Sequence, residues 1–219
     1  AIDHDSNVRI VHVSNKAQLG APVAIAADLR VGDHTYGGGE LRVTNAGDKP
    51  ILTLRGAWII TLSSGRVTEQ RWNVGGVTSI WFGGRNPGAE DEIPVAGPPN
   101  NITSGQETIK HVKAQLKGVV FADRTYWGDE GTTVMQDLRT EAQAFLMVAV
   151  KVREMYQGSK SNELVRQMVT PSSDPAAGIF PNAKYSSTFR LTLMKNGVLR
   201  ADAGQWMDRI VESLKQFLV

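Results

Sequence analysis

The spacing of apolar residues changes once along this chain, and that change limits the folds it can adopt. Before residues 113–131 (KAQLKGVVFADRTYWGDEG), apolar and polar residues mostly alternate, which is the period of a β-strand. After this segment, apolar residues recur every three or four positions, which is the period of an α-helix. A chain that begins as sheet and continues as helix belongs to the α+β class. The segment therefore contains the last strand and the lead-in to the helices.

Alternation and turn residues predict the strands of the N-terminal part. In residues 22–31 every odd position from Val23 to Val31 is apolar, which is typical of a strand with one buried face. Strands are also predicted over residues 8–14, 41–45, 50–62, 77–82 and 108–121, with an edge strand or a loop over residues 66–72. Trp58 falls on the apolar face of its strand, and His12 is predicted to be a sheet histidine with a hydrogen-bond partner. Several short strands separated by turns favour an antiparallel β-sandwich.

A helix is predicted from residue 132 to about residue 156, with Thr133 and Gln136 as a capping box and Gly158 as its end. Shorter helices are predicted over residues 161–169 and at the C-terminus, where Asp202 and Gln205 would form a cap. The last helix carries an apolar stripe, made of Trp206, Ile210, Leu214, Phe217 and Leu218. Residues 184–196 fit either a helix or a strand, and their helical flanks favour a helix.

We therefore predict an N-terminal antiparallel, immunoglobulin-like β-sandwich over residues 1–127. A small helical region over residues 128–219 follows and is predicted to pack on it, either as a second domain or as part of one continuous domain. Residues 83–105 are predicted to form a long loop, with a short strand at residues 92–95 as one alternative. Its acidic run, residues 90–92, is interpreted as solvated, because three consecutive carboxylates do not converge on a Ca²⁺ ion.

Composition excludes several classes of function. The formal net charge is +2, and no basic block with interleaved aromatic residues is present, so no nucleic-acid partner is predicted. The chain has no cysteine, which excludes disulfides and thiolate chemistry. No apolar run approaches the roughly 20 residues that span a bilayer, so the chain is not predicted to cross a membrane. The glycines at residues 37–39 precede a strand-like segment, which favours a loop or a bulge over a phosphate-binding turn.

The search for chemistry gives one polar cluster and no catalytic motif. No nucleophile, metal-ligand or dinucleotide signature is present, so no catalytic residue, metal or cofactor is predicted. The cluster is Asp123, Tyr126, Trp127 and Glu130, in which aromatic rings could stack on a sugar while carboxylates accept its hydroxyl protons. Asp123 and Glu130 could also act as a general acid and base. The simpler interpretation is a turn at residues 122–125, a packed Trp127 and acidic residues that precede a helix.

Two segments carry a resemblance. Residues 43–51 (VTNAGDKPI) resemble a polar Lys-Pro turn between two strands in exported bacterial sandwich proteins. Residues 118–129 (GVVFADRTYWGD) resemble a V-V-F-x-D-G-T-x-W-G stretch in uncharacterised exported proteins of soil bacteria, with Arg124 where glycine is expected. The resemblance implies a secreted bacterial protein with an immunoglobulin-like β-sandwich, and it assigns no site residue. The first residue, Ala1, fits a mature protein whose signal peptide has been removed, and also a trimmed chain.

Three functions stay open at this point. We expect a non-catalytic exported protein, periplasmic or extracellular, that binds another exported protein or a glycan. One alternative is a carbohydrate-binding module or hydrolase that uses the Asp123, Trp127 and Glu130 corner, with Trp72 or Trp81 as a further aromatic. The other is a structural component of a larger assembly, which would expose a large apolar patch.

Overall fold

The computed structural model describes residues 8–16, 18–37, 39–95, 107–158 and 203–219. The predicted helix at 161–169, the ambiguous residues 184–196 and the predicted cap residue Asp202 lie outside these ranges. The chain divides into two compact units. The first comprises residues 1–75 and 84–134, and the second comprises residues 76–83 and 135–219.

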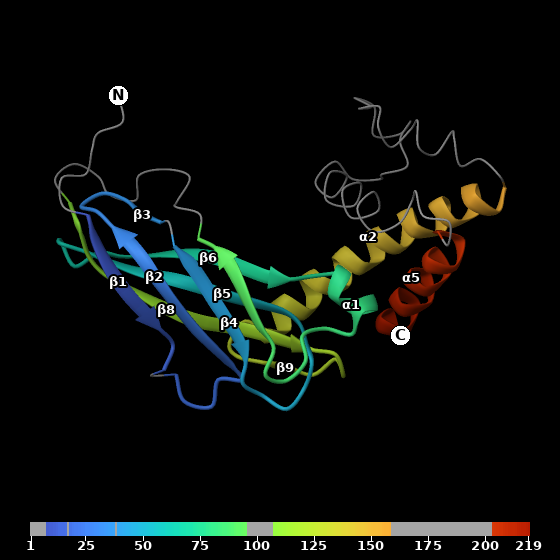
Figure 1. The fold of residues 1–219 in the computed structure, drawn as a ribbon, viewed down its shortest axis with the longest axis horizontal. Coiled ribbons are helices and arrows are strands. Elements are labelled where there is room, and N and C mark those ends of the chain that lie inside the picture. Colours follow the sequence, from blue (N-terminus) through green and yellow to red (C-terminus); the bar gives the residue numbers. More distant parts are fainter. Residues whose placement is uncertain (1–7, 17, 38, 96–106, 159–202) are drawn as a thin grey trace, which may run out of the picture. The chain divides into compact units, whose positions relative to one another are not determined.

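The first unit contains two antiparallel sheets (Figure 1). The five-stranded sheet, called sheet A, has the order β1 (Arg9–Ser14), β2 (Val23–Val31), β4 (Glu40–Asn45) and β7 (Glu90–Pro94), with β3 (Tyr36–Gly37) also paired to β2. The four-stranded sheet, called sheet B, has the order β6 (Val67–Gly75), β5 (Ile51–Leu62), β8 (Ile109–Phe121) and β9 (Tyr126–Trp127). The two sheets pack as a sandwich, which confirms the predicted α+β class with an N-terminal antiparallel sandwich.

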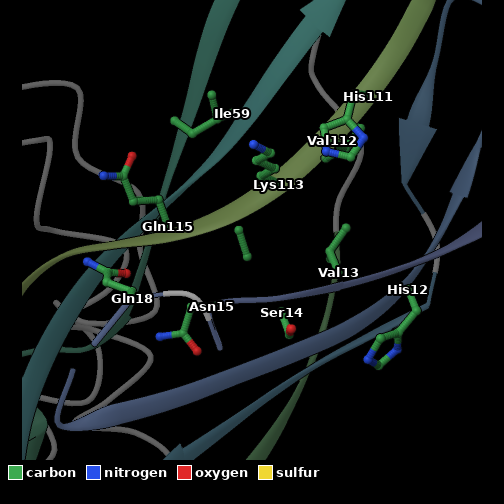
Figure 2. A pocket seen from close by; sticks show the side chains of 11 residues that line it. His12, Val13, Ser14, Asn15, Gln18, Ile59, His111, Val112, Lys113 and Gln115 are labelled. Carbon is green, nitrogen blue, oxygen red and sulfur yellow. The ribbon is translucent and has the colours of Figure 1, made fainter. Parts of the chain in front are cut away.

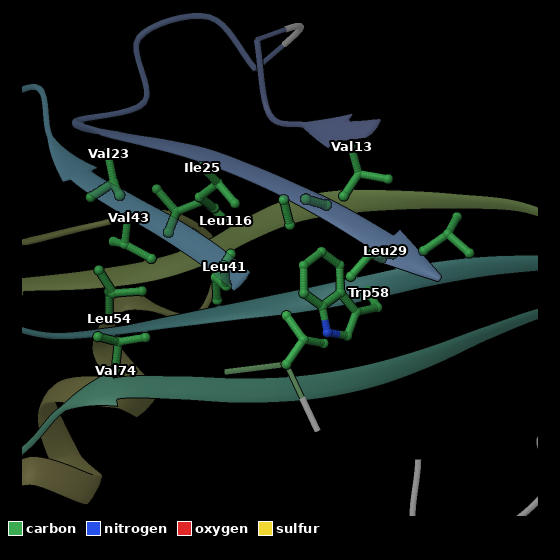
Figure 3. Close-up of a cluster of buried hydrophobic side chains, with 14 of the residues drawn as sticks. Val13, Val23, Ile25, Leu29, Leu41, Val43, Leu54, Trp58, Val74 and Leu116 are labelled. Atoms are coloured by element: carbon green, nitrogen blue, oxygen red, sulfur yellow. The ribbon is translucent and has the colours of Figure 1, made fainter. Parts of the chain in front are cut away.

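The core lies between the two sheets and follows the predicted alternation. The predicted apolar face of β2 consists of every second residue from Val23 to Val31, and all of these residues are buried. Figure 3 shows Val23, Ile25 and Leu29 on the same side of the core as Leu41 and Val43 of β4, opposite Leu54 and Trp58 of β5. Each large apolar side chain buried here contributes roughly 2 kcal/mol relative to its exposed state. Trp58 is buried, as predicted.

Strand β5 is central in sheet B, and it has buried residues on both of its faces, whereas the buried residues of β2 lie on one face. Its inner face buries Leu54, Trp58, Ile60 and Leu62, while Thr53 and Ala57 on its other face are also buried. The burial of strand β8 changes along its length. Lys110, His111 and Lys113 are exposed at its start, whereas residues 118–121 are buried on both faces.

Residues 77–82 were predicted as a strand, but residues 78–82 form a helix instead. Helix α1 spans Thr78–Phe82 and ends at Gly83, whose left-handed conformation (φ 81°) lets its N–H donate to the carbonyl of Ser79. Six residues are too few to distinguish the two periods, so contacts decide the conformation. Trp81 is buried and packs on Phe145 within the second unit, with ring centroids 5.1 Å apart.

The acidic run was predicted in a solvated loop, and this prediction is wrong. Residues 90–92 belong to edge strand β7, which pairs with β4 from Glu40 to Thr44. The suggested short strand therefore exists, but it begins at residue 90 and not at residue 92. Pairing with β4 outweighs the low intrinsic strand preference of Asp and Glu.

Within the described ranges, two longer helices follow the sheets along the chain. Helix α2 (Gly131–Gln157) buries apolar residues that recur every three or four positions, as predicted for this part of the chain, and α5 (Ala203–Leu218) packs beside α1 in the second unit. In α5 the buried apolar residues are Met207, Ile210, Val211, Leu214 and Phe217. The predicted capping box is wrong, because α2 begins before Thr133 and the carbonyl of Glu130 accepts a hydrogen bond from Val134 N (2.9 Å). Among the described residues, no helix is long and apolar enough to cross a membrane.

A glycine in β5 makes room for a tryptophan, which gives a test of the core. A Cβ atom on Gly56 would lie 2.1 Å from Cζ2 of Trp72, whose ring packs against Trp58 at 5.7 Å between centroids. We expect Gly56→Ala to lower the free energy of unfolding by about 1–3 kcal/mol, since the Trp72 ring must move. Urea denaturation measures this change. In a Trp72→Val background the same substitution should cost much less, and equal costs in both backgrounds would contradict the packing.

Candidate functional site

Asp123, the first residue of the predicted corner, stabilises a turn. Its Oδ1 accepts hydrogen bonds from the backbone N (3.0 Å) and the hydroxyl (2.6 Å) of Thr125, and its Oδ2 pairs with Nζ of Lys49 at 2.7 Å. The hydrogen bond from Lys49, followed by those from Thr125, lowers the pKa of Asp123 to about 2. The carboxyl group is therefore ionised at neutral pH, which suits a turn and not a general acid.

Glu130, the other carboxylate of the corner, belongs to an ion-pair network on sheet B. It pairs with Arg71 at 2.9 Å and with Arg55 at 3.4 Å. Glu69 extends the network by pairing with both Arg71 and Lys117 at 2.8 Å. These hydrogen bonds, from Arg71 first and then Lys117, lower the pKa of Glu69. Glu130 is thus held by cations that do not contact Asp123, whose own ion pair is with Lys49.

Close approach of the chain to β8 places Glu130 in this network. A Cβ atom on Gly118 would lie 2.9 Å from the carbonyl carbon of Glu130 and from the N atom of Gly131. Only glycine leaves this space, so the residues before α2 lie directly against the strand. Both carboxylates of the predicted corner therefore have structural partners, and ligand binding at this corner stays a prediction.

The two aromatic residues of the corner form β9, and they differ in exposure. Tyr126 is 52% exposed, whereas Trp127 is half-buried and packs against the sandwich core. Arg124, in the preceding turn, has φ 68°, a left-handed conformation that L-residues other than Asn and Asp seldom adopt. Glycine adopts this conformation readily, which gives a physical reason for the glycine at the corresponding position of the V-V-F-x-D-G-T-x-W-G stretch.

The sequence gives no sign of a groove that lies between β1 and β8 in the first unit. Its volume is about 560 Å³. Figure 2 shows side chains of β1 and the loop after it on one side and side chains of β8 on the other. The lining residues are His12, Val13, Ser14, Asn15, Gln18, Ile59, His111, Val112, Lys113, Ala114 and Gln115. They come from segments about a hundred positions apart, so local patterns do not bring them together.

The groove lies where two strand edges face each other without pairing. β1 is the outer strand of sheet A, and β9 covers only Val119 and Val120 of β8 in sheet B. No backbone hydrogen bond joins β1 to β8, both of which the structure describes throughout. Along each edge, alternate residues direct their N–H and C=O groups away from the neighbouring strand.

Side chains already occupy both ends of the β8 edge. The amide of Gln18 donates to the carbonyl of Leu116 (2.7 Å) and accepts from its N–H (3.0 Å), as a neighbouring strand would. At the other end, the guanidinium of Arg9 donates to the carbonyl of Ile109 at 2.8 Å. By alternation from Leu116, the groups of Ala114 and Val112 also point outward. For these two residues no hydrogen bond in this direction is found among the described residues.

The outer edge of β1 pairs with no other strand that the structure describes. Asn15 N donates to Ile25 O (3.3 Å), which fixes the alternation: Val13 and Val11 pair with β2, while Ser14, His12 and Ile10 point outward. Within the part of the chain that the structure describes, the outward backbone groups of these three residues have no partner. A row of backbone N–H and C=O groups without protein partners is a template for pairing, so this edge can accept another strand.

The charges around the groove are mostly positive. Lys113 lines it, whereas no carboxylate does. Lys113 has no ion pair among the described residues, although Lys117 on the same strand pairs with Glu69. Nδ1 of His12 lies 2.8 Å from Oδ1 of Asp28 on the neighbouring strand, which confirms the predicted sheet histidine. No group of three or more His, Cys, Asp or Glu that could hold a metal is found among the described residues.

No protein-family model matches this chain, and neither a curated protein nor a solved structure matches it. Relatives therefore add no site residue to those that the geometry brings together. The alternating polar residues of 108–121, which predict a one-sided strand, are the one sequence signal that lies in the groove. They could indicate a solvated face but not which segment lies opposite.

The left-handed conformation of Arg124 can be tested by substitution. We expect Arg124→Gly to be more stable than Arg124→Ala by about 1 kcal/mol, because glycine adopts this conformation without a steric penalty. Both variants lack the guanidinium, so the comparison isolates the backbone. Urea denaturation gives the two free energies of unfolding, and equal values would contradict the assigned conformation.

The ion pair of Asp123 predicts a pH dependence. Its pKa in the folded protein, about 2, is below the ordinary 3.8, so the carboxylate stabilises the fold above pH 3.8 and ceases to do so as the pH falls through about 2. Because the side chain is 46% exposed, we expect Asp123→Asn to cost less than about 1 kcal/mol at pH 7. Urea denaturation at pH 7, 4 and 2 should show this difference disappearing. The control Asp48→Asn, in the exposed turn before β5, should show no such trend.

Proposed function

We propose that this protein is a non-catalytic binding protein that takes an extended segment of a partner protein as an additional strand on β1. Main-chain hydrogen bonds to Ile10, His12 and Ser14 supply affinity in this mode of binding. The groove between β1 and β8 receives alternate side chains of the segment and supplies specificity. An exported location, which the sequence resemblance implies, is part of the proposal.

The proposal rests on the unpaired outer edge of β1, and a comparison with β7, the opposite edge of sheet A, supports it. Exposed edges invite unwanted pairing, and proteins commonly protect them with charged residues or proline. The opposite edge of sheet A, β7, carries Glu90, Glu92 and Pro94. Strand β1 has no proline, and the guanidinium of Arg9 at its start is bonded to the carbonyl of Ile109 on β8, while Ile10 is 76% exposed. The residues of β1 after Arg9 include no acidic residue and no proline, which supports a role in pairing.

Binding is assigned to β1 and not to β8 because their edges differ in availability. Gln18 and Arg9 already bond the two ends of the β8 edge, which leaves the short stretch around Val112 and Ala114. On β1 the outward groups of three successive alternate residues have no partner among the described residues. A segment of five or six residues in extended form is about 17–20 Å long and matches the length of β1.

The ion pairs of Asp123 and Glu130 at the predicted corner support a function without catalysis. A glycoside hydrolase needs two carboxyl groups that flank one bond, one of them able to donate a proton. Asp123 has a lowered pKa and is paired with Lys49, and Glu130 is paired with Arg55 and Arg71. These partners favour a structural role for both carboxylates over an acid–base pair.

The test removes one outward N–H of β1 without removing a ladder bond to β2. The N–H of Ser14 points outward, so Ser14→Pro deletes a bond to the added strand while the pairing of Val13 with Ala27 is kept. Peptides selected from a random phage-displayed library against the full chain would be synthesised with a fluorophore. We expect Ser14→Pro to weaken their binding at least about tenfold, measured by fluorescence anisotropy.

Two controls separate the backbone from other effects. Ser14→Ala removes the hydroxyl and keeps the N–H, so it should bind nearly as the parent chain does. Val67→Pro introduces a proline on the edge strand β6 of the other sheet and should leave binding unchanged. Thermal melts check that all three variants are folded. A selected peptide that binds Ser14→Pro as tightly as the parent chain, or the failure of selection to yield any binder, would overturn the proposal.

A further inference from the structure

We infer that the segment bound at β1 is acidic, with a glutamate side chain that reaches Lys113 across the groove. This inference rests on the proposed function and specifies the chemistry of its partner. It concerns a segment of another protein, recognised in extended form by its backbone and by a carboxylate.

The first support is the charge of the groove lining. Its charged or titratable side chains are Lys113, His12 and His111, and no Asp or Glu is among the residues that line it. Asp28 is nearby, but it is bonded to His12 and lies 4.0 Å from the guanidinium of Arg42. An added carboxylate would therefore meet a cation in the groove and no lining anion.

The second support is the contrast between Lys113 and other lysines of the sandwich. Lys117 pairs with Glu69 at 2.8 Å and Lys49 pairs with Asp123 at 2.7 Å. Lys113, two alternations before Lys117 on β8, has no carboxylate partner among the described residues. Its cross-strand neighbour on β5 is Ile59, which offers no charge. A lysine in a groove with an open pairing edge beside it is suited to a carboxylate that arrives with the added strand.

The third support is the apolar floor that such a side chain would cross. Val13 on β1 and Val112 and Ala114 on β8 line the groove, and all three are buried. The methylene groups of glutamate can pack on these residues while its carboxylate reaches the ammonium group. On the outer face of β1, exposed Ile10 favours an apolar residue opposite it, because cross-strand apolar pairs are stabilising. The predicted segment therefore alternates glutamate with β-branched apolar residues.

The test uses three labelled heptapeptides that differ only at two positions. The probe is Thr-Val-Glu-Val-Glu-Val-Thr, and the comparison peptides carry glutamine or lysine in place of both glutamates. We expect the glutamate peptide to bind the full chain about tenfold more tightly than the lysine peptide at low salt, with the glutamine peptide between them. The difference should shrink as salt is added, since exposed ion pairs are screened. Fluorescence anisotropy measures all three affinities.

Substitutions then locate the effect. Lys113→Gln should remove most of the preference for glutamate. Lys49→Gln changes the net charge equally, but Lys49 lies in the turn before β5 and pairs with Asp123, so this variant should retain the preference. Lys113→Glu should reverse the preference and favour the lysine peptide. A reversal of this kind is not expected from a variant that is merely destabilised, and thermal melts confirm folding.

The outcomes distinguish this inference from the proposed function. Equal affinity for the glutamate and glutamine peptides, or an unchanged preference in Lys113→Gln, would overturn the acidic assignment and leave strand addition intact. If none of the three binds while a phage-selected peptide does, the acidic assignment fails alone. If the chain self-associates at micromolar concentration and Glu92→Lys on β7 abolishes this, the acidic segment belongs to a second copy, and the assignment to another protein is overturned.

Discussion

Each strand needs hydrogen-bond partners at both of its edges, and this need determines the structure of the outer strands of the sandwich. Central strands such as β5 satisfy the requirement with neighbours on both sides, β6 and β8. At the outer strands the chain has to supply another solution, because an edge group without a partner either remains in water or invites pairing. Strand β7 carries acidic residues and Pro94, and β8 receives side-chain hydrogen bonds, whereas the outward backbone groups of Ile10, His12 and Ser14 on β1 have no partner among the described residues. The location of the candidate site follows from this difference.

The loop after β1 shows how closely the two sheets depend on such bonds. Asn15 donates from Nδ2 to the carbonyl of Val23 (2.8 Å) and accepts from the N–H of Ile25 (2.8 Å), so its amide extends the pairing of sheet A. Three residues later, the amide of Gln18 makes the equivalent pair of bonds to Leu116 of sheet B. One short loop thus supplies a strand-like partner to each sheet and defines one end of the groove. Alternatives such as Asp or Glu could not donate and accept at once.

Periodicity predicted the features that depend on neighbouring residues. The buried face of β2, the position of Trp58 and most of α2 follow from which residues recur at period 2 or 3.6. Helix α1 was missed because five residues hold too little pattern, and its conformation depends on the contact of Trp81 with Phe145 far along the chain. The same limit applies to the groove, where Ser14 and Lys113 are brought together only by the fold.

The predicted corner and the groove also differ in what their polar groups already bind, and this difference bears on function. At the corner, Asp123 and Glu130 are matched by Lys49, Arg55 and Arg71, so a ligand would have to displace existing ion pairs. In the groove, Lys113 and the outward backbone groups of β1 have no such partners among the described residues, so a ligand would displace water there and no ion pair of the protein. Binding free energy is the surplus after desolvation and displacement, so the site with unmet hydrogen-bonding capacity is favoured. The cluster of carboxylates and aromatic rings in the sequence therefore indicates the corner, whose polar groups are already paired, and not the groove, whose polar groups are not.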